Sequence, residues 1–237
     1  MAKKPVKRAE QIETVYSQKR WTILKELRAK TVQRMQVLDD NNLRSIVHGS
    51  IARGDVSETS DIDVFLPNPP SSFIIETALE RSGFSVYQRK IVQATPLYAM
   101  KGYIELADQC SISFPLVKMR STEKEFYKFG GEATIDTLKQ DKRVAGVDKR
   151  LMLIEPTQTG HRESTVIGCE EEVANLLGVS LNTVLDRVHA LLRRDEVGRT
   201  GVFIEKELTP DETFEQALKQ VADKNPAVRR RAKFFQK

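Results

Sequence analysis

Apolar residues recur at spacings of three and four near the start of the chain, which predicts one long amphipathic helix over residues 9–38. Its apolar stripe has one polar member, Thr31, and consists of Trp21, Leu24, Leu27, Thr31, Met35 and Leu38. The turn-forming residues Asp-Asn at 40–41 and their neighbours end the helix. We expect this helix to pack its apolar side on the domain that follows.

Short apolar runs between turn residues come next and predict a sheet. Strands are expected over residues 43–48, 61–66, 84–92, 97–101 and 103–106, and a helix over 73–81. Gly102 is interpreted as the turn of a hairpin. Residues 121–150 are mixed and charged, with a break at Gly130-Gly131, and are interpreted as a connector that contains helix.

A different order of elements begins near Leu151. Helical periodicity over residues 170–177 is followed by a tight turn and a second helix over 181–194, with Ser180 as the expected N-cap. A further turn then leads into an apolar run at 202–204. Helix, turn, helix and hairpin in this order are typical of a winged helix-turn-helix.

These patterns predict an α/β (α+β) protein in three parts. Residues 1–40 form the N-terminal helix, 41–150 form a domain with a mixed sheet and flanking helices, and 151–237 form a small winged-helix domain with a basic tail. A chain of 237 residues has room for such an arrangement.

Composition limits the classes of protein that the chain can belong to. No apolar run approaches the roughly 20 residues that a membrane span needs, so no membrane partner is expected. The basic N-terminus lacks the apolar segment of a secretory signal. Cys110 and Cys169 are too few for a disulfide framework, and we interpret them as buried free thiols in a reducing cytoplasm.

The net charge is +5, and the excess gathers near the two ends of the chain. The clusters are Lys3, Lys4, Lys7 and Arg8, and Arg229, Arg230, Arg231 and Lys233. Such clusters favour nucleic-acid binding because each neutralised phosphate releases counterions. A solvated tail that only aids solubility is the alternative.

The strongest chemical signal is Gly49-Ser50 followed, after ten residues, by Asp61-Ile62-Asp63. In a strand, Asp61 and Asp63 project to one side while Ile62 points to the other. Two neighbouring carboxylates repel one another unless a cation lies between them, and Mg²⁺ prefers such oxygen ligands. Gly49 lets backbone approach a phosphate, and the Ser50 hydroxyl can donate to it.

This combination resembles the signature of the polymerase β-like nucleotidyltransferase superfamily, which is Gly-Ser, a spacer and Asp-x-Asp on a strand. The motif and its neighbouring residues are similar to those of archaeal-type stand-alone nucleotidyltransferases and of the catalytic domain of CCA-adding enzymes. The resemblance implies two-metal transfer of a nucleoside monophosphate from a triphosphate, with Mg²⁺, or alternatively Mn²⁺, held by Asp61 and Asp63. It also implies nucleotide binding by Gly49, Ser50 and the nearby Arg53.

The superfamily uses a third carboxylate from a neighbouring strand. Glu105 fits an apolar-acid-apolar pattern and is our choice as third catalytic and metal-binding residue. Asp108 is the competitor, and a purely solvated Glu105 is the other alternative. Further cations that could meet a triphosphate, each with a solvated helix face as the simpler interpretation, are Lys139, Lys142, Arg143, Lys149 and Arg150.

Two histidines and four residues of the second unit complete the candidates. His48 is interpreted as a packing residue, and His161 as a residue without a recognisable activating partner. The predicted winged helix would contact nucleic acid through Asn182, Thr183, Arg187 and Arg199. A helical module for substrate positioning or dimerisation is the alternative.

Three functions follow from these expectations. The first is a nucleotidyltransferase that extends a polynucleotide end, RNA in preference to DNA. The second is nucleotidylation of a partner protein. The third is a winged-helix transcriptional regulator that only senses nucleotide.

Overall fold

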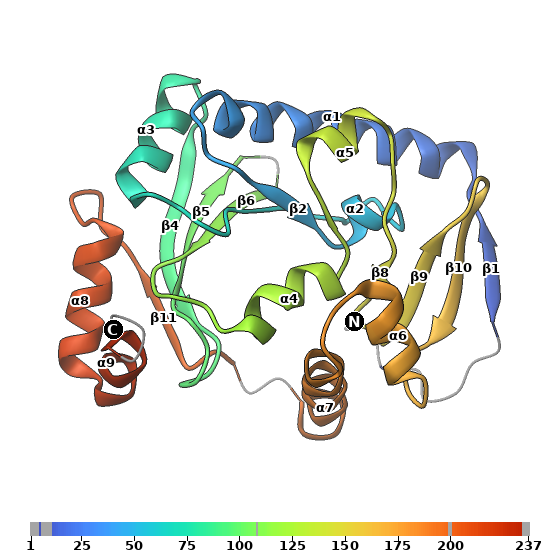
Figure 1. Cartoon of the computed structure of the whole chain (residues 1–237). Coiled ribbons are helices and arrows are strands. Elements are labelled where there is room, and N and C mark those ends of the chain that lie inside the picture. The colour runs from blue at the N-terminus through green and yellow to red at the C-terminus, as the bar shows by residue number, and fades with distance from the viewer. Residues whose placement is uncertain (1–4, 6–10, 108, 199–200, 234–237) are drawn as a thin grey trace. The chain divides into compact units, whose positions relative to one another are not determined.

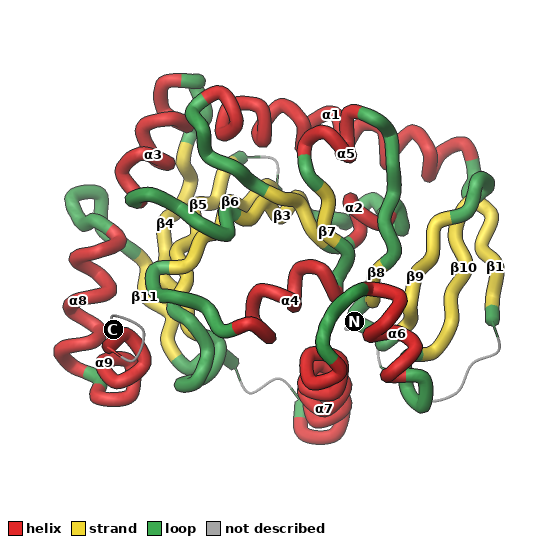
Figure 2. Tube along the Cα trace, in the orientation of Figure 1, coloured by secondary structure: helices red, strands yellow, loops and turns green. Residues whose placement is uncertain are grey.

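In the described part of the chain, helices and strands are interspersed in an α+β arrangement with a mixed sheet (Figures 1 and 2). The computed structural model describes residues 5, 11–107, 109–198 and 201–233. The chain forms two units, each made of three separate segments. Unit 1 consists of Met1–Val32, Val47–Ser60 and Ser121–Thr200, and unit 2 consists of Gln33–Ile46, Asp61–Arg120 and Gly201–Lys237.

The N-terminal helix is shorter than the sequence predicts. Helix α1 spans Gln18–Asp40 and is preceded by a strand, β1 (Ile12–Val15). The β-branched residues Ile12, Thr14 and Val15 favour an extended backbone there. β1 pairs antiparallel with β10, with Ile12 opposite Glu163, so a partner distant in sequence decides the conformation of this segment.

Unit 1 contains a four-stranded antiparallel sheet in the order β1-β10-β9-β8. Its strands are β8 (Gly146–Val147), β9 (Met152–Pro156) and β10 (Gly160–Thr165), besides β1. A second, short pairing joins β2 (Ile46–His48) to β7 (Glu132–Ala133). The helices are α2 (Ser50–Arg53), α4 (Ser121–Phe129), α5 (Ile135–Lys139), α6 (Glu170–Leu177) and α7 (Leu181–Val197).

The helix pair α6–α7 has the predicted turn. Gly178 ends α6 in the left-handed conformation with φ 60°, and the Ser180 side chain caps α7 by accepting from the Thr183 amide. Apolar residues of both helices, including Val173 and Val184, share one core with Leu153 of β9. The helix-turn-helix part of the predicted pattern is therefore present in unit 1.

The strand predicted as the wing has a different partner. Residues 202–204 lead into β11 (Ile204–Glu207), which pairs antiparallel with β4 (Val86–Gln93), with Ile204 opposite Gln93. This strand is an edge of the unit 2 sheet, so the expectation of a hairpin at this point was wrong. Local sequence predicts a strand but does not select its partner.

Unit 2 is built around five strands in the order β11-β4-β5-β6-β3. Three of them are β3 (Ile62–Phe65), β5 (Lys101–Leu106) and β6 (Cys110–Pro115). β3 runs parallel to β6 and the other pairs are antiparallel, which makes the sheet mixed, as predicted. The helices are α3 (Ser72–Arg81), α8 (Phe214–Lys224) and α9 (Pro226–Lys233).

The two faces of the unit 2 sheet differ in polarity. Alternate residues such as Ile62, Ile104 and Ile112 are buried, and Phe114 of this face meets Phe214 of α8 with ring centroids 5.0 Å apart. Residues on the opposite face, including Asp63 and Glu105, remain partly exposed. This alternation leaves one sheet face for chemistry while the other forms the core.

Gly102 lies inside β5, so the predicted hairpin turn and the predicted strand over residues 97–101 were both wrong. Residues 94–98 form the turns between β4 and β5. A Cβ on Gly102 would lie 2.7 Å from Phe114 and 2.9 Å from Phe214. The glycine therefore serves close packing within a strand rather than a turn.

Two smaller outcomes concern the connector and the thiols. Residues 121–150 contain α4 and α5, separated by the predicted break at Gly130-Gly131. Cys110 is buried, whereas Cys169 is exposed, so the expectation of two buried thiols holds only for the first. None of the helices in the described part of the chain combines the length and apolar character that a bilayer crossing requires.

Candidate active site

Asp61 and Asp63 lie at the start of β3. Asp61 directly precedes the strand and is exposed, and Asp63 is partly exposed, whereas Ile62 and Val64 between and after them are buried. The alternation in exposure follows the two-residue period of a strand. That the two carboxylates project to one side stays a prediction. Among the described residues, neither carboxylate forms an ion pair with a lysine, arginine or histidine.

Asp63 has a hydroxyl partner on the neighbouring strand. Ser111 of β6 is directly opposite Asp63 in the parallel register, and its Oγ donates to Asp63 Oδ1 over 2.9 Å. Glu105 of β5 is in turn opposite Ser111. Asp63, Ser111 and Glu105 thus form one row across three strands, on the same face of the sheet.

Glu105 is already paired with a cation. Lys90 Nζ of β4 lies 2.6 Å from Glu105 Oε1 and 3.7 Å from Glu205 Oε1. The hydrogen bond with Glu105 is the main cause that raises the pKa of Lys90 above its ordinary value. Beside this pair, burial and the negative charge of Asp63 raise the pKa of Tyr103 to about 12.

The donor set suits a divalent cation in part. Two neighbouring carboxylates without a cationic partner among the described residues supply the hard oxygen ligands that Mg²⁺ prefers, and phosphate oxygens commonly complete its coordination. In the parts of the chain that the structure describes, no group of three or more His, Cys, Asp or Glu side chains could hold a metal ion. Asp108 lies outside the described residues.

Gly49 and Ser50 form a sharp turn between β2 and α2 in unit 1. Gly49 has φ 84° and ψ −144°, a backbone conformation that residues other than glycine rarely adopt. A Cβ at this position would meet no atom within 4 Å. Its amide donates to the Gly131 carbonyl over 2.9 Å. Ser50 Oγ donates to Ser60 Oγ over 3.3 Å, and Ser60 is the residue that directly precedes Asp61 in sequence.

Arg53 is buried and its donors are in use. Nε and Nη2 donate to the two carboxylate oxygens of Asp55 over 3.0 and 2.9 Å, and Nη1 donates to the carbonyls of Gly130 and Val147. Its side chain is 7% exposed. These contacts describe a residue that fastens the α2 turn to the residues around it, and each of its three nitrogens already has an acceptor.

Three further arginines of unit 1 bind backbone carbonyls. Arg28 of α1 donates to the carbonyls of Ile51 and Ala52, and Arg20 donates to the Val56 carbonyl over 3.0 Å. Arg143 donates to the carbonyls of Gly160 and Thr157. Burial, and then the nearby charge of Arg143, lower the pKa of Arg28 to about 10. Of the cations proposed to meet a triphosphate, Arg143 thus has a backbone role.

The remaining predicted cations differ in their surroundings. Arg150 binds Asp148 and Glu163, with Nε to Asp148 Oδ2 at 2.6 Å and Nη2 to Glu163 Oε1 at 2.7 Å. Lys139, Lys142 and Lys149 belong to unit 1, where Lys142 and Lys149 are exposed.

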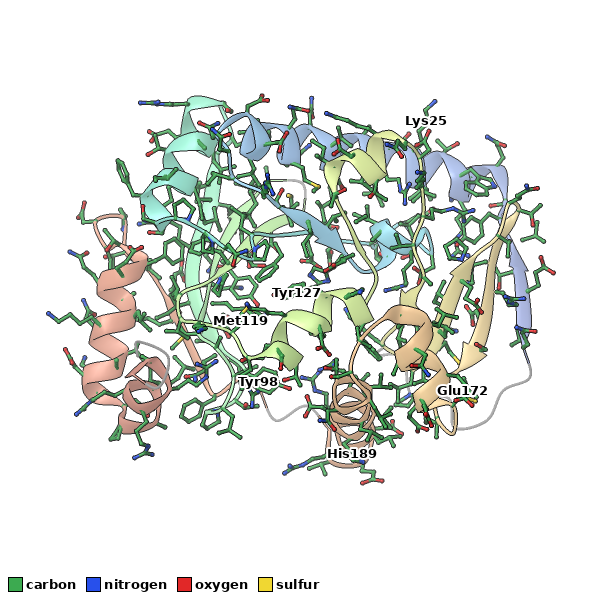
Figure 3. All side chains as sticks on the ribbon, in the orientation of Figure 1. Lys25, Tyr98, Met119, Tyr127, Glu172 and His189 are labelled. Carbon is green, nitrogen blue, oxygen red and sulfur yellow. The ribbon has the colours of Figure 1, made fainter. Side chains whose placement is uncertain are left out.

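His48 and His161 pack in unit 1. The His48 ring meets the ring of Tyr127 on α4, labelled in Figure 3, at a centroid distance of 4.9 Å. His161 is 1% exposed, with Nδ1 at 2.7 Å from the Tyr16 hydroxyl and Nε2 at 2.8 Å from Glu163 Oε1. Burial raises the pKa of Tyr16 to about 12. The sequence offered no partner for His161 because Tyr16 is 145 residues away.

The predicted nucleic-acid contacts of α7 fall on two sides of the helix. Asn182 is exposed, as is His189 in Figure 3. Thr183 is buried and donates to Glu125 Oε2 of α4 over 2.7 Å, and Arg187 lies over the Phe126 ring at 4.7 Å. Thr183 and Arg187 therefore hold α7 against α4. Arg199 lies outside the described residues.

The basic C-terminal cluster is also partly structural. Arg231 is 8% exposed and donates to the carbonyls of Leu97 and Lys118, each over 3.0 Å. Arg229 donates to the carbonyls of Ala222 and Asp223 at the end of α8. Arg230 is exposed. Arg231 therefore attaches α9 to the segments around Leu97 and Lys118, and Arg229, although exposed, joins α9 to the end of α8.

Sequence reasoning missed Ser111, Lys90 and Glu125. The alternation Ser111-Ile112-Ser113-Phe114 is the two-residue period of a half-buried strand and could have revealed β6. No local signal marks Lys90 or Glu125, since their partners are brought together only by strand pairing and helix packing.

Comparisons with known proteins bear on this region. Residues 24–125 match the family model described as nucleotidyltransferase domain. A solved structure of a cytoplasmic RNA terminal U-transferase matches at 25% identity over 42% of this chain and 30% of that chain, with a TM-score of 0.30. A superposition at that score supports no conclusion about fold or activity. No curated protein matches the chain. The family match covers Gly49, Ser50, Asp61 and Asp63, and it supports nucleotidyl transfer as the class of activity.

Proposed function

Because residues 24–125 match a nucleotidyltransferase domain, we propose that the protein transfers a nucleoside monophosphate from a nucleoside triphosphate to an acceptor hydroxyl in a metal-dependent reaction. The observation that carries the proposal is the pair Asp61 and Asp63, which are exposed and partly exposed on either side of the buried Ile62 and lack a cationic side-chain partner among the described residues. Unpaired neighbouring carboxylates are unfavourable without an external cation.

The residues of this chain have distinct parts in the proposed reaction. Asp61 and Asp63 bind the divalent ions, and Ser111 orients the Asp63 carboxylate through its hydrogen bond. Gly49 and Ser50 bind phosphate oxygens of a nucleotide, a role that rests on the sequence motif and on the open space at Gly49. Mg²⁺ held there would neutralise the triphosphate and the pyrophosphate that leaves, and it would lower the pKa of the attacking hydroxyl.

Glu105 can serve as the third carboxylate only after it leaves Lys90. The 2.6 Å ion pair holds its oxygen on the side of β4, one strand further from Asp63 than Ser111. Arg53 keeps the α2 turn in shape, and it contributes to phosphate binding through that turn rather than by direct contact.

A polynucleotide end, RNA in preference to DNA, is the acceptor that we propose. The net charge of +5 supports an anionic acceptor, although Arg229 and Arg231 are used within the fold. The buried Thr183 and the packed Arg187 remove two contacts from the predicted recognition helix, so the proposal no longer rests on α7.

The test is incubation of the full chain with α-³²P-labelled ATP, CTP, GTP or UTP, Mg²⁺, total RNA and a protein extract. We expect label in RNA, and no label with Asp61→Asn. Asp39→Asn, which removes an exposed acid at the end of α1, is the matched control and should be unaffected. Label in protein would favour nucleotidylation of a partner. Equal labelling by wild type and Asp61→Asn would contradict the proposal.

A further inference from the structure

The row Asp63, Ser111 and Glu105 carries an inference that rests on the proposed function. Ser111 occupies the position directly beside Asp63 on the adjacent strand, and strands in a sheet are about 4.8 Å apart. A side chain in this position points to the same side as Asp63 and is close enough to share a bound ion with it. Here the position holds a neutral hydroxyl.

The next carboxylate on this face, Glu105, is further from Asp63 than Ser111 is, and its charge is already compensated by Lys90. Glu105 is opposite Ser111 on β5, two strands from Asp63, and its oxygen is 2.6 Å from Lys90 Nζ. The side chains of Lys90 and Glu105 are 22% and 33% exposed, so the pair is partly shielded from water. Glu105 therefore adds little negative charge at Asp61 and Asp63.

The free protein thus presents two carboxylates to a cation, and one of them already accepts a hydrogen bond from Ser111. Mg²⁺ loses its hydration water reluctantly and is usually held by one or two carboxylates together with substrate phosphates. A set of two carboxylates needs those phosphate oxygens to complete the coordination.

We infer that Ser111 is the residue that keeps the free protein from retaining a divalent cation, so that the cation binds only together with a nucleoside triphosphate. An acidic residue at position 111 would complete a set of three carboxylates on adjacent strands. Ser111 is accordingly a positioning residue for Asp63 and the determinant of how strongly the ion binds without nucleotide.

The test is calorimetric titration of Mn²⁺ into the full chain, alone and with a non-hydrolysable α,β-methylene ATP analogue, each titration corrected for Mn²⁺ binding to the analogue in the absence of protein. For wild type we expect at least about tenfold tighter binding with the analogue, which corresponds to about 1.4 kcal/mol. Ser111→Asp should bind Mn²⁺ without nucleotide at least about tenfold more tightly than wild type. Ser111→Ala, the matched control, should show no such gain.

The outcomes separate the inference from the proposed function. Equal Mn²⁺ affinity of wild type with and without the analogue overturns the inference, and this comparison needs no variant. A folded Ser111→Asp protein without gain also overturns it. If wild type binds no Mn²⁺ even with the analogue, the proposed function itself is contradicted. If Ser111→Asp binds Mn²⁺ tightly without the analogue while wild type needs the analogue, both the inference and the proposed function are supported.

Discussion

Directly after α2, the Asp55 carboxylate is paired with Arg53, and the two side chains are 11% and 7% exposed. On β3, only a few residues later in the sequence, Asp61 is exposed and Asp63 partly exposed, and neither has a basic side-chain partner within the described residues. The same residue type therefore occurs in two electrostatic settings within one short stretch.

The difference shows which acids shape the fold and which remain available. A carboxylate that accepts two hydrogen bonds from a guanidinium is fully matched and contributes to a defined loop conformation. A pair of unmatched carboxylates contributes repulsion to the folded state, and an external cation relieves it. In this chain the arginines hold the turn through its backbone, while the unmatched acids lie on a sheet face.

The largest effect is expected from Arg53→Ala, which removes the cationic partner of Asp55. Loss of one partner leaves Asp55 buried and uncompensated, and we expect a decrease of about 3–5 kcal/mol in the free energy of unfolding. Urea denaturation measures it. The double variant Arg53→Ala/Asp55→Ala should recover part of the loss. A decrease below about 1 kcal/mol for Arg53→Ala would place this pair with ordinary surface ion pairs.

Asp63→Asn removes the charge of one of the two carboxylates that lack a basic partner among the described residues. The amide oxygen still accepts from Ser111, but the charge is lost, so we expect transfer to fall by more than about 100-fold, beyond the 10–100-fold typical of groups that only support a metal ligand. The free energy of unfolding should stay the same or rise. Single-turnover kinetics and urea denaturation check the two parts, and a large loss of stability would show that Asp63 is structural.

Arg28→Ala tests how much an arginine stabilises the fold when its acceptors are backbone carbonyls instead of a carboxylate. The carbonyls of Ile51 and Ala52 lose a buried donor, and we expect a decrease of about 1–3 kcal/mol in the free energy of unfolding. Lys25→Ala, on the exposed side of the same helix, is the matched control (Figure 3). Equal stability of Arg28→Ala and Lys25→Ala would contradict the role of Arg28.

The smallest effect concerns Glu125, a third acid that is matched by hydroxyls rather than by arginine. Burial opposes its ionisation, but hydrogen bonds from Ser180 and Thr183 outweigh burial and lower its pKa below 4.5. Its stabilisation is therefore complete above pH 4.5 and is lost as the pH falls through the lower, folded pKa. Ionised Glu125 should stabilise α4 against α7 by about 1 kcal/mol more than a neutral amide does.

Urea denaturation of wild type and Glu125→Gln at pH 7 and pH 3 measures this contribution. We expect wild type to be the more stable protein at pH 7 and the difference to shrink at pH 3. A difference that grows toward low pH would reverse the assigned sign.

The sequence predicted elements well where local chemistry decides them. Residues 170–177 form a helix as predicted, and Ser180 caps the next helix, because periodicity and a capping side chain act within a few residues. The alternation of buried and exposed residues around Asp61 and Asp63 could also be predicted from the sequence, because the two-residue period of a strand is a local property. Whether these acids bind an ion stays a prediction.

Long-range partners account for the errors. β1 was taken as helix because its partner β10 is far away in sequence, and β11 was taken as a wing because its partner β4 belongs to an earlier segment. Gly102 was taken as a turn because its two aromatic neighbours come from β6 and α8. The contacts of Lys90 with Glu105 and of Arg53 with Gly130 likewise exist only once distant segments meet.

The pairing of β1 with β10 and of β4 with β11 has a consequence for biosynthesis. A nascent chain displays β1 for about 150 residues of translation before its partner emerges, and β4 for about 110, which at about 5–20 residues per second amounts to roughly 5–30 seconds. β1 therefore stays unpaired until residue 163 has been made, and the edge of β4 that receives β11 stays open until residue 207 has been made. Fragments that stop earlier would expose those edges to other chains.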